Sequence, residues 1–519
     1  MSIAEQMGNT LQRTSISTSI KERLDFSCAI FSKDGSLVAN APHVPVHLGS
    51  MQFAIQYQHR LWEGKLQPGD VLLTNHPSCG GTHLPDLTVI TPVFFEDNLV
   101  FYTASRGHHT DIGGVGITSM APESKYLWEE GLNVRSMKII SKGVFLEAEI
   151  RAAFNAAADF PGCSATRRIN DNLSDLKAQA SSNQRGISLL QKMCKEFGIP
   201  VVHSYMYGIQ DNAELAVRNY FKSFPPERRI LQAIDHYDDG TPVHLKITID
   251  GETGSAIFDF EGTGAQIYGN MNAPISISYS AVIYALRCLI DIEIPLNQGC
   301  LNPITISIPE GTILNPSPLV GICGGTISSQ RITDTIFKAF GSCAASQGCA
   351  NSFGWGMGGK DPATGKVTPG WNFGESLGGG SGAGPTWHGA HGTHVHGTNT
   401  PSTDLEIIEK RTAVIMRKYA INRGTGGKGK FNGGDGIIRR VEARIPLKFS
   451  IISERRVFQP YGMQGGSSGA VGKNFVYKKV ENGSLEKSNL GGKAIVLLEA
   501  GESVEIQTPG GGGWGNVDN

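Results

Sequence analysis

The chain has 519 residues, a formal net charge of −1 at pH 7 and 39% hydrophobic residues. A chain of this length is too long for one hydrophobic core and predicts two to four domains. Because positive and negative charges are balanced, no basic surface for nucleic acid is expected. No apolar run approaches the roughly 20 residues that cross a bilayer, and the N-terminus lacks the pattern of a secretory signal. We therefore expect neither nucleic acid nor a membrane among its partners.

Cysteine and glycine usage adds two expectations. The nine cysteines are odd in number and include no C-x-x-C pair, which favours reduced thiols packed in the core of a cytoplasmic protein. The 66 glycines exceed the average share of about 7% and are clustered without a fixed period. This distribution excludes collagen and indicates many tight turns in ordered loops.

The first elements are a helix and a hairpin. Apolar residues recur at helical spacing over residues 1–15. Leu24–Phe31 has strand character, and the Lys-Asp-Gly turn that follows sends the chain back through SLVAN. Asp25 lies at the start of this strand, where a carboxylate is typical of a cap or a turn. His43 and His47 flank prolines ahead of a predicted helix over Met51–Trp62, and both loop packing and hydrogen bonding to a nearby site fit them.

The segment Asn75–Gly114 carries the strongest local signal. It contains two strand-like runs, Leu87–Phe95 and Leu99–Ala104, separated by the polar group Glu96-Asp97-Asn98. In an antiparallel hairpin folded about Asp97, the numbers of paired residues sum to about 194. The pattern therefore predicts a β-hairpin whose open end carries the polar residues of the segment.

The predicted register gathers histidines and carboxylates at that open end. It sets Asp86 opposite His108 and His83 opposite Asp111, with paired residues roughly 4.5–5.5 Å apart. His109 lies beside them. Ligands of these types suit a divalent metal such as Zn or Mn. A polar strand end with solvated histidines explains the same spacing, so the residues alone leave both interpretations open.

The rest of the chain predicts further helices and strands in separate regions. Helical patterns cover residues 143–158, 171–197, 205–224, 278–290 and 329–340, and VHLKITIDG with GSAIFDFEG forms a hairpin. From Asn351 to Gly397 glycine dominates, and four histidines occur there: His388, His391, His394 and His396. An ordered loop that closes over a site is the preferred interpretation of this tract, with surface histidines as the alternative. The final stretch alternates in short apolar runs typical of β-structure.

These patterns predict a multi-domain, mixed α/β (α+β) fold with three regions. Residues 1–226 form an N-terminal metal-binding region of a β-hairpin with helices. Residues 227–404 form a mixed α/β domain with the glycine- and histidine-rich loop. Residues 405–519 form a β-rich C-terminal region. The loop GTGGKGKFNGGDG departs from the phosphate-binding G-x-x-x-x-G-K-[ST] pattern, which occurs nowhere in the chain, so no ATP site is expected here.

Longer motifs resemble a known family. They include SISTSIKERLDFSCAIF, PHVPVHLGSM, GDVLLTNHPSCGGTHLPDLTVITPVF, ASRGHHTDIGG, GNMNAPISISYSAVIYALRC, ERRVFQPYGMQGG and TPGGGGWG. The sequence resembles hydantoinase B proteins over nearly its whole length, and within them the C-terminal half of ATP-dependent 5-oxoprolinase. The motifs KERLDFS and GAGPTWHG bring it closer to the oxoprolinases than to the related acetone carboxylases.

The resemblance implies a set of metal ligands. Family members hold a divalent metal through an Asp, a His-x-x-Asp pair and a further His. The matching positions are Asp25 in LDFS, His83 and Asp86 in THLPD, and His108 in GHHTDIGG. Beside them, His109 and Asp111 become candidates for proton transfer or for orienting the ligands.

The resemblance also implies a reaction and a partner. In 5-oxoprolinases a hydantoinase A-type half is thought to phosphorylate the lactam with ATP, and the metal site of the other half hydrolyses the activated intermediate. This chain matches only the second half, so we expect a hydantoinase A-type ATPase subunit as partner, a small-molecule substrate and an oligomeric assembly. Two alternatives remain: a carboxylase subunit of the acetone carboxylase type, and a stand-alone domain without catalysis.

Two positions depart from the family pattern. The late run HMTNTR of the family is His396-Gly397-Thr398-Asn399-Thr400-Pro401 here, so Gly397 and Pro401 replace a methionine and an arginine. If that arginine binds a substrate carboxylate, recognition of 5-oxoproline is in question. The family's GGN before a late helix is Gly-Gly-Thr at 324–326.

Overall fold

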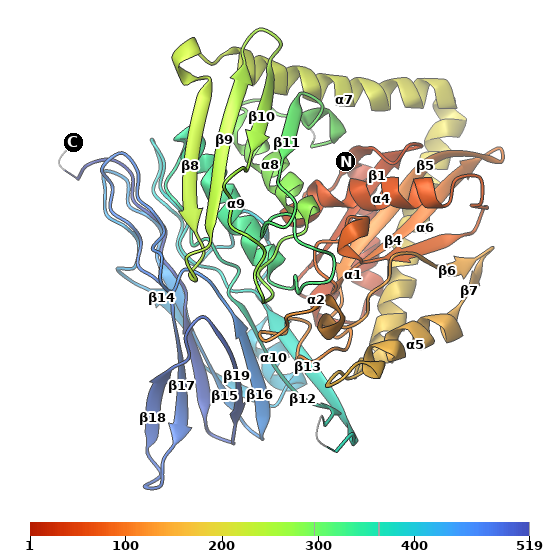
Figure 1. The fold of residues 1–519 in the computed structure, drawn as a ribbon. Helices are drawn as coiled ribbons and strands as arrows, with labels where there is room; N and C mark the ends of the chain where they lie inside the picture. Colours follow the sequence, from red (N-terminus) through yellow and green to blue (C-terminus); the bar gives the residue numbers. More distant parts are fainter. Residues whose placement is uncertain (295, 362–363, 518–519) are drawn as a thin grey trace.

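The computed structural model describes residues 1–294, 296–361 and 364–517 (Figure 1). It confirms a mixed α/β fold with several sheets and helices. No helix in these ranges is long and apolar enough to cross a membrane. All nine cysteines are free, as the sequence predicts.

The N-terminal region is built on a seven-stranded antiparallel sheet in the order β2-β1-β5-β4-β3-β6-β7. Its strands are β1 (Phe26–Ser32), β2 (Leu37–Asn40), β3 (Val71–Thr74), β4 (Asp86–Phe95), β5 (Asn98–His108), β6 (Met137–Ser141) and β7 (Val144–Phe145). The predicted hairpin is β4–β5. Glu96 and Asp97 form its turn with positive φ angles of 48° and 63°, which suits a tight two-residue connection.

Helices cover both faces of this sheet (Figure 1). Successive strand residues point to opposite faces. Ala29 and Phe31 therefore pack with α4, while Cys28 packs with α1 and Ile30 packs with α6. Burial on both faces explains why β1 is apolar throughout rather than alternating. The helices of this region are α1 (Ser2–Thr14), α2 (Thr18–Lys21), α3 (Pro45–Leu48), α4 (Ser50–Leu61), α5 (Glu147–Ala156), α6 (Ile169–Phe197) and α7 (Ile199–Lys222).

The middle region pairs a four-stranded sheet with two helices. The sheet has the order β11-β10-β9-β8, and β10 and β11 are parallel. One face of β9 is buried at alternate residues and packs with the two helices in one core, which matches the predicted alternation. The elements are β8 (Ile230–His236), β9 (Pro242–Asp250), β10 (Ser255–Asp259), β11 (Ile304–Ser307), α8 (Ile275–Leu289) and α9 (Gly325–Phe340).

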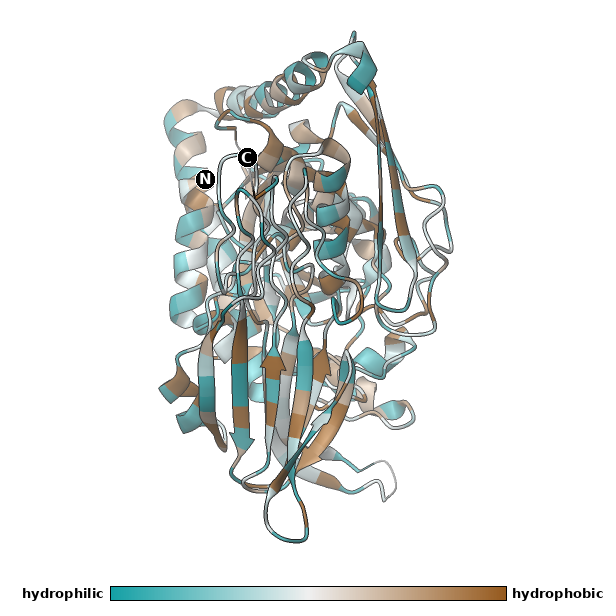
Figure 2. Cartoon of the chain, turned by 90° about the vertical axis from the view of Figure 1, so that its left-hand side faces the viewer, coloured by the Kyte–Doolittle hydropathy of each residue, from teal (hydrophilic) through white to brown (hydrophobic). Residues whose placement is uncertain are grey.

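The C-terminal region contains two further sheets that share one core. Figure 2 shows hydrophobic and hydrophilic bands alternating along these strands. One sheet has the order β13-β12-β16-β19 and the other β14-β15-β20-β17-β18. The strands are β12 (Ser352–Lys360), β13 (Val367–Glu375), β14 (Val414–Asn422), β15 (Gly436–Ala443), β16 (Leu447–Ile452), β17 (Lys473–Lys479), β18 (Leu485–Asn489), β19 (Lys493–Leu498) and β20 (Ser503–Gln507).

The prediction of one ordered loop over Asn351–Gly397 is wrong in its first half, because β12 and β13 lie there. β12 pairs with β16, so these two strands belong to a sheet of the C-terminal region. The glycines of β12 do not mark a loop here, because they allow the backbones of β12 and β13 to approach each other closely. A Cβ at Gly356 would lie 2.5 Å from the Trp371 carbonyl oxygen. The final stretch also contains one helix, α10 (Leu405–Arg411).

Four glycine-rich segments form a layer above the C-terminal strands, which we call the glycine layer: residues 378–384, 426–434, 462–469 and 510–515 (Figure 1). Backbone hydrogen bonds join them, for example from the Gly434 amide to the Ser381 carbonyl at 2.9 Å. A Cβ at Gly380 would lie 1.9 Å from the Gly434 carbonyl oxygen, and one at Gly511 would lie 2.0 Å from that of Ser381. Only glycine allows backbones to approach this closely.

Candidate active site

Three neighbouring strands end at the same place and bring together the predicted ligands. Asp86 pairs with His108 across β4 and β5, as the hairpin register predicts. Phe26 pairs with Gly107 across β1 and β5, and the His108 amide donates to the Asp25 carbonyl at 3.0 Å. Asp25 and Asp86 therefore flank His108 on either side. The sheet thus places two carboxylates beside one histidine.

His83 reaches the same place through a turn. The Asp86 amide donates to the His83 carbonyl at 3.1 Å, so the chain folds back just before β4 begins. The rings of His83 and His108 have centroids 5.1 Å apart. The predicted pairing of His83 with Asp111 is wrong, because the β4–β5 ladder ends at Asp86 and His108. The structure nevertheless gathers all four predicted ligands.

One oxygen of the Asp86 carboxylate, Oδ2, has several polar partners. It accepts hydrogen bonds from Thr82 Oγ1 and from His47 Nε2, the latter at 3.1 Å. The other ring nitrogen of His47, Nδ1, lies 2.9 Å from Ser27 Oγ. His83 Nδ1 lies 3.0 Å from Asp86 Oδ2. Of the two interpretations that the sequence left open for His47, loop packing and hydrogen bonding to a nearby site, the structure supports the second, because His47 orients Asp86. His43 instead accepts a hydrogen bond from the Cys28 amide.

Burial and charge give these groups different protonation states. Burial disfavours the charge of Asp86, but His83 and His47 outweigh it and hold its pKa well below the usual range. Burial also opposes charge on His83, yet the carboxylates of Asp86 and Asp25 outweigh it and raise its pKa. For His108 burial dominates and lowers the pKa to about 4. These shifts favour an anionic Asp86 and a neutral His108, and they move His83 toward its protonated form beside Asp86.

The fit of a divalent metal can be judged from the donors. Asp86 Oδ1 and His108 Nδ1 are buried without a hydrogen-bond partner, which is costly unless something else binds them. Imidazole nitrogens and carboxylate oxygens suit Zn or Mn. Among the residues that the structure describes, no three or more His, Cys, Asp or Glu side chains have the arrangement of a formed metal centre. The donor types and the unpartnered atoms therefore fit a divalent metal. The present distance between His83 and Asp86 is that of an ion pair between these two side chains.

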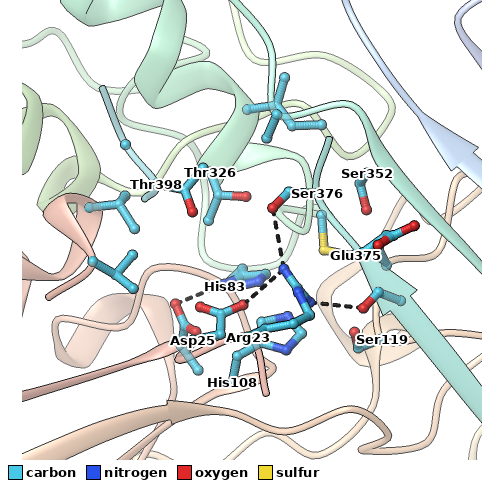
Figure 3. A pocket seen from close by; sticks show the side chains of 18 of the residues that line it. Arg23, Asp25, His83, His108, Ser119, Thr326, Ser352, Glu375, Ser376 and Thr398 are labelled. Atoms are coloured by element: carbon cyan, nitrogen blue, oxygen red, sulfur yellow. Dashed lines mark hydrogen bonds and ion pairs between the residues drawn. The ribbon is translucent and has the colours of Figure 1, made fainter. Parts of the chain in front are cut away.

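A cavity lies beside these residues, and segments from all three regions line it (Figure 3). The N-terminal region contributes the four predicted ligands and Arg23. Thr326 comes from the start of α9, and Ser352 from the start of β12. Ser376 follows β13, and Thr398 lies in the loop before α10. The cavity therefore exists only where the three regions meet.

His109 and Asp111 do not reach this cavity. His109 Nε2 lies 3.1 Å from Gln179 Oε1, and its Nδ1 accepts from Asn172. Asp111 is paired with Arg167 at 3.2 Å. The sequence prediction placed both beside the metal ligands, but consecutive strand residues face opposite sides of a sheet. His109 therefore turns toward α6 while His108 faces the cavity, so the structure gives no support to a role in proton transfer.

The four late histidines do not line the cavity either. The amides of Asn432 and Asp435 donate to His388 and His391, which are exposed. His396 Nε2 lies 3.0 Å from Asp334 Oδ1, and both ring nitrogens of His394 are buried without a partner. The C-terminal end of the glycine- and histidine-rich tract does reach the site, because Gly397 and the following Thr398 line the cavity. Pro401 is exposed and does not line it.

Arg23 and Ser376 line the cavity although the sequence did not predict either of them as a site residue. Arg23 lies two residues before Asp25 within the KERLDFS motif, and that position could have marked it as a candidate. Ser376 has no local signal, since only the fold brings the end of β13 to the cavity. Long-range contacts of this kind are not encoded in spacing.

Fold and cavity together define a multi-domain α/β protein with a buried histidine and carboxylate site enclosed by all three regions. The chain belongs to the hydantoinase B/oxoprolinase family, because the sequence model of that family matches residues 1–517. It is 65% identical over 520 residues to the 5-oxoprolinase PfmaA of Pestalotiopsis fici, covering 100% of this chain and 40% of that protein. The chain thus spans less than half of the relative's length.

Solved structures show the same fold. The ATP-dependent caprolactamase from Pseudomonas jessenii matches with a TM-score of 0.87 and 22% identity, over 99% of this chain and 89% of that chain. The nucleotide-free acetone carboxylase matches with a TM-score of 0.86 and 16% identity, over 99% and 74% of the two chains. Both identities are low, so these matches establish the fold and leave the reaction to other arguments.

Proposed function

We propose that this chain is the hydrolytic part of an ATP-dependent cyclic amidase that converts 5-oxo-L-proline, ATP and water to L-glutamate, ADP and phosphate. The observation that carries the proposal is the convergence of Asp25, His83, Asp86 and His108 in one enclosed cavity. The 65% identity to a 5-oxoprolinase supports the choice of substrate. In this proposal a hydantoinase A-type ATPase, on a partner chain or a further segment, activates the lactam.

The proposed metal ligands are Asp25, His83, Asp86 and His108, with Zn or Mn as the ion. A bound divalent ion would polarise a carbonyl group and lower the pKa of a water ligand from 15.7 to about 7. Ligation requires a neutral His83, so metal binding would compete with protonation of this ring. His47 and Thr82 hold the Asp86 carboxylate in one orientation through the contacts given above.

The experiment is reconstitution with a hydantoinase A-type ATPase. Lactam-dependent release of phosphate from ATP is expected only when both components and the metal are present, with 5-oxoproline and a hydantoin as substrates. No turnover with either lactam would refute the proposal. Incorporation of labelled bicarbonate into the product would instead favour the carboxylase alternative, because a hydrolase forms no new carbon–carbon bond. The chain without its partner is the matched control.

A further inference from the structure

Arg23 is a buried cation inside the cavity (Figure 3). It lies between α2 and β1 and is 5% exposed. Its Nη1 donates to the Gly374 carbonyl at 2.8 Å, and its Nη2 donates to Ser376 Oγ at 3.2 Å and lies 3.4 Å from Asp25 Oδ2. A carbonyl group, a hydroxyl group and the Asp25 carboxylate thus hold the guanidinium in place.

The charges around the cavity single out this arginine. Of the described residues that line the cavity, Arg23 is the one lysine or arginine. Two of the other cavity carboxylates pair elsewhere: Glu375 pairs with Arg439 at 2.8 Å, and Asp86 pairs with His83 and His47. Asp25 is the ion-pair partner of Arg23 itself, at 3.4 Å. As a proposed metal ligand, Asp25 would share its charge with the bound ion, and Arg23 would then be the group in the cavity best able to neutralise a further anion.

The guanidinium also keeps unused donors. It carries five N–H groups in a planar fork, and the contacts with described residues use three of them. The unused donors are Nε–H and one Nη1–H, and each can form a charge-assisted hydrogen bond to an anion, roughly twice as strong as a neutral one. Hydroxyl groups of Ser376, Thr398 and Thr326 line the same cavity and can donate to the same anion (Figure 3).

We propose that Arg23, together with Ser376, binds the carboxylate of the substrate and selects lactams that carry a carboxylate next to the ring nitrogen. This inference rests on the proposed function and narrows its substrate class. The inference also bears on the arginine of the family pattern that Pro401 replaces. Position 401 is exposed and lies outside the cavity, so in this proposal the cation at the site is Arg23 and not a residue at position 401.

Two other roles for Arg23 make different predictions. If Arg23 only positions Asp25, its loss weakens every ligand of the cavity alike. If it binds a phosphoryl group, its loss weakens inorganic phosphate most. A carboxylate is the favoured ligand because one guanidinium balances a single negative charge, whereas a phosphoryl group carries about two at pH 7.

The test is calorimetric titration of the whole chain with L-5-oxoproline, 2-pyrrolidinone and inorganic phosphate. 2-Pyrrolidinone has the same lactam ring without the carboxylate. Arg23→Met should weaken 5-oxoproline binding by about 10- to 100-fold, the loss expected for a hydrogen-bonded charge pair, and leave 2-pyrrolidinone within about twofold of wild type. Arg23→Lys should recover part of the loss because it restores the charge without the fork. Arg13→Met, in an exposed part of α1, is the matched control.

Three outcomes would overturn the inference: equal losses for both lactams, no preference of the wild-type chain for 5-oxoproline, or Arg23-dependent phosphate binding tighter than that of 5-oxoproline. Retained binding of 2-pyrrolidinone by Arg23→Met shows that the variant is folded. The inference and the proposed function fail separately. ATP-dependent turnover of carboxylate-free lactams without any effect of Arg23 refutes the inference alone, whereas absence of all lactam turnover with the partner refutes the function.

Discussion

Glu130 provides a sharp test of the electrostatics around the site. It ends the 3-10 helix Leu127–Glu130 and is 2% exposed. Its Oε1 accepts hydrogen bonds from Ser124 Oγ at 2.8 Å and from the amides of Ile322 and Cys323 at 2.9 and 3.0 Å. Its Oε2 is buried without a partner. The side chain thus joins the loop after the β4–β5 hairpin to the segment that leads into α9.

Burial raises the pKa of Glu130 to about 7 from an ordinary value of 4.5, against the hydrogen bonds that lower it. Because the folded state binds the proton more tightly than the unfolded chain, the stabilisation is fully present below pH 4.5 and is lost as the pH rises through 7. The difference of about 2.5 pKa units corresponds to about 3 kcal/mol, at about 1.4 kcal/mol per unit.

Glu130→Gln removes this titration and keeps an oxygen that can accept the same three hydrogen bonds. We expect the variant and the wild type to have similar thermal unfolding midpoints at pH 5. At pH 9 the variant should be more stable by about 3 kcal/mol, visible as a midpoint higher by a few degrees. Glu63→Gln, at an exposed site, is the control for removal of a carboxylate. A difference between Glu130→Gln and wild type that does not change from pH 5 to pH 9 would refute the assigned pKa.

Three further predictions concern the metal, the glycine layer and a buried ion pair. Asp86→Asn should lower bound metal, measured by mass spectrometry after dialysis, by about tenfold or more, whereas Asp97→Asn at the exposed turn of the same hairpin should not; equal metal contents would mean that the ligand set is wrong. Gly434→Ala should cost about 1–3 kcal/mol or more, because its Cβ would lie 1.9 Å from a carbonyl oxygen. Gly208→Ala, in open space on α7, should instead stabilise by up to about 1 kcal/mol; thermal midpoints that move alike would contradict the close packing. Arg331→Met removes the partner of Glu454, which lies 2.9 Å away with both side chains buried. The thermal unfolding midpoint should fall by an amount equivalent to about 3–5 kcal/mol of the free energy of unfolding. An unchanged midpoint would show that the ion pair contributes nothing to stability.

The sequence predicted the part of the site that depends on local pairing. The turn at residues 96–97 pairs Phe95 with Asn98, and a one-residue bulge between Val93 and Phe94 then brings the strands into the predicted register, in which Asp86 pairs with His108. Asp25 could not be found this way, because it joins the site through the pairing of β1 with β5. Only the family motif identified it in advance.

The errors have physical causes as well. Extending the hairpin register beyond the last paired residues put Asp111 opposite His83 and His109 beside the ligands, although the ladder had ended and the facing of side chains alternates. Glycine content predicts a loop where β12 lies, because composition does not distinguish a flexible backbone from one that must approach another closely. Arg23 and Ser376 meet through tertiary contacts alone.

The glycine layer has a consequence for the order in which the molecule can assemble. Its four segments are separated by 41, 27 and 40 residues along the chain, so their contacts close long loops and form slowly. Residues 510–515 hydrogen-bond to segments near 345, 380 and 430, and the tract from 376 to 398 supplies Ser376 and Thr398 to the cavity. During synthesis that tract lacks one of its backbone partners until residues 510–515 emerge. The cavity is therefore completed late, although the β4–β5 hairpin and the turn before it, which contribute three of the four proposed ligands, lie within the first 114 residues.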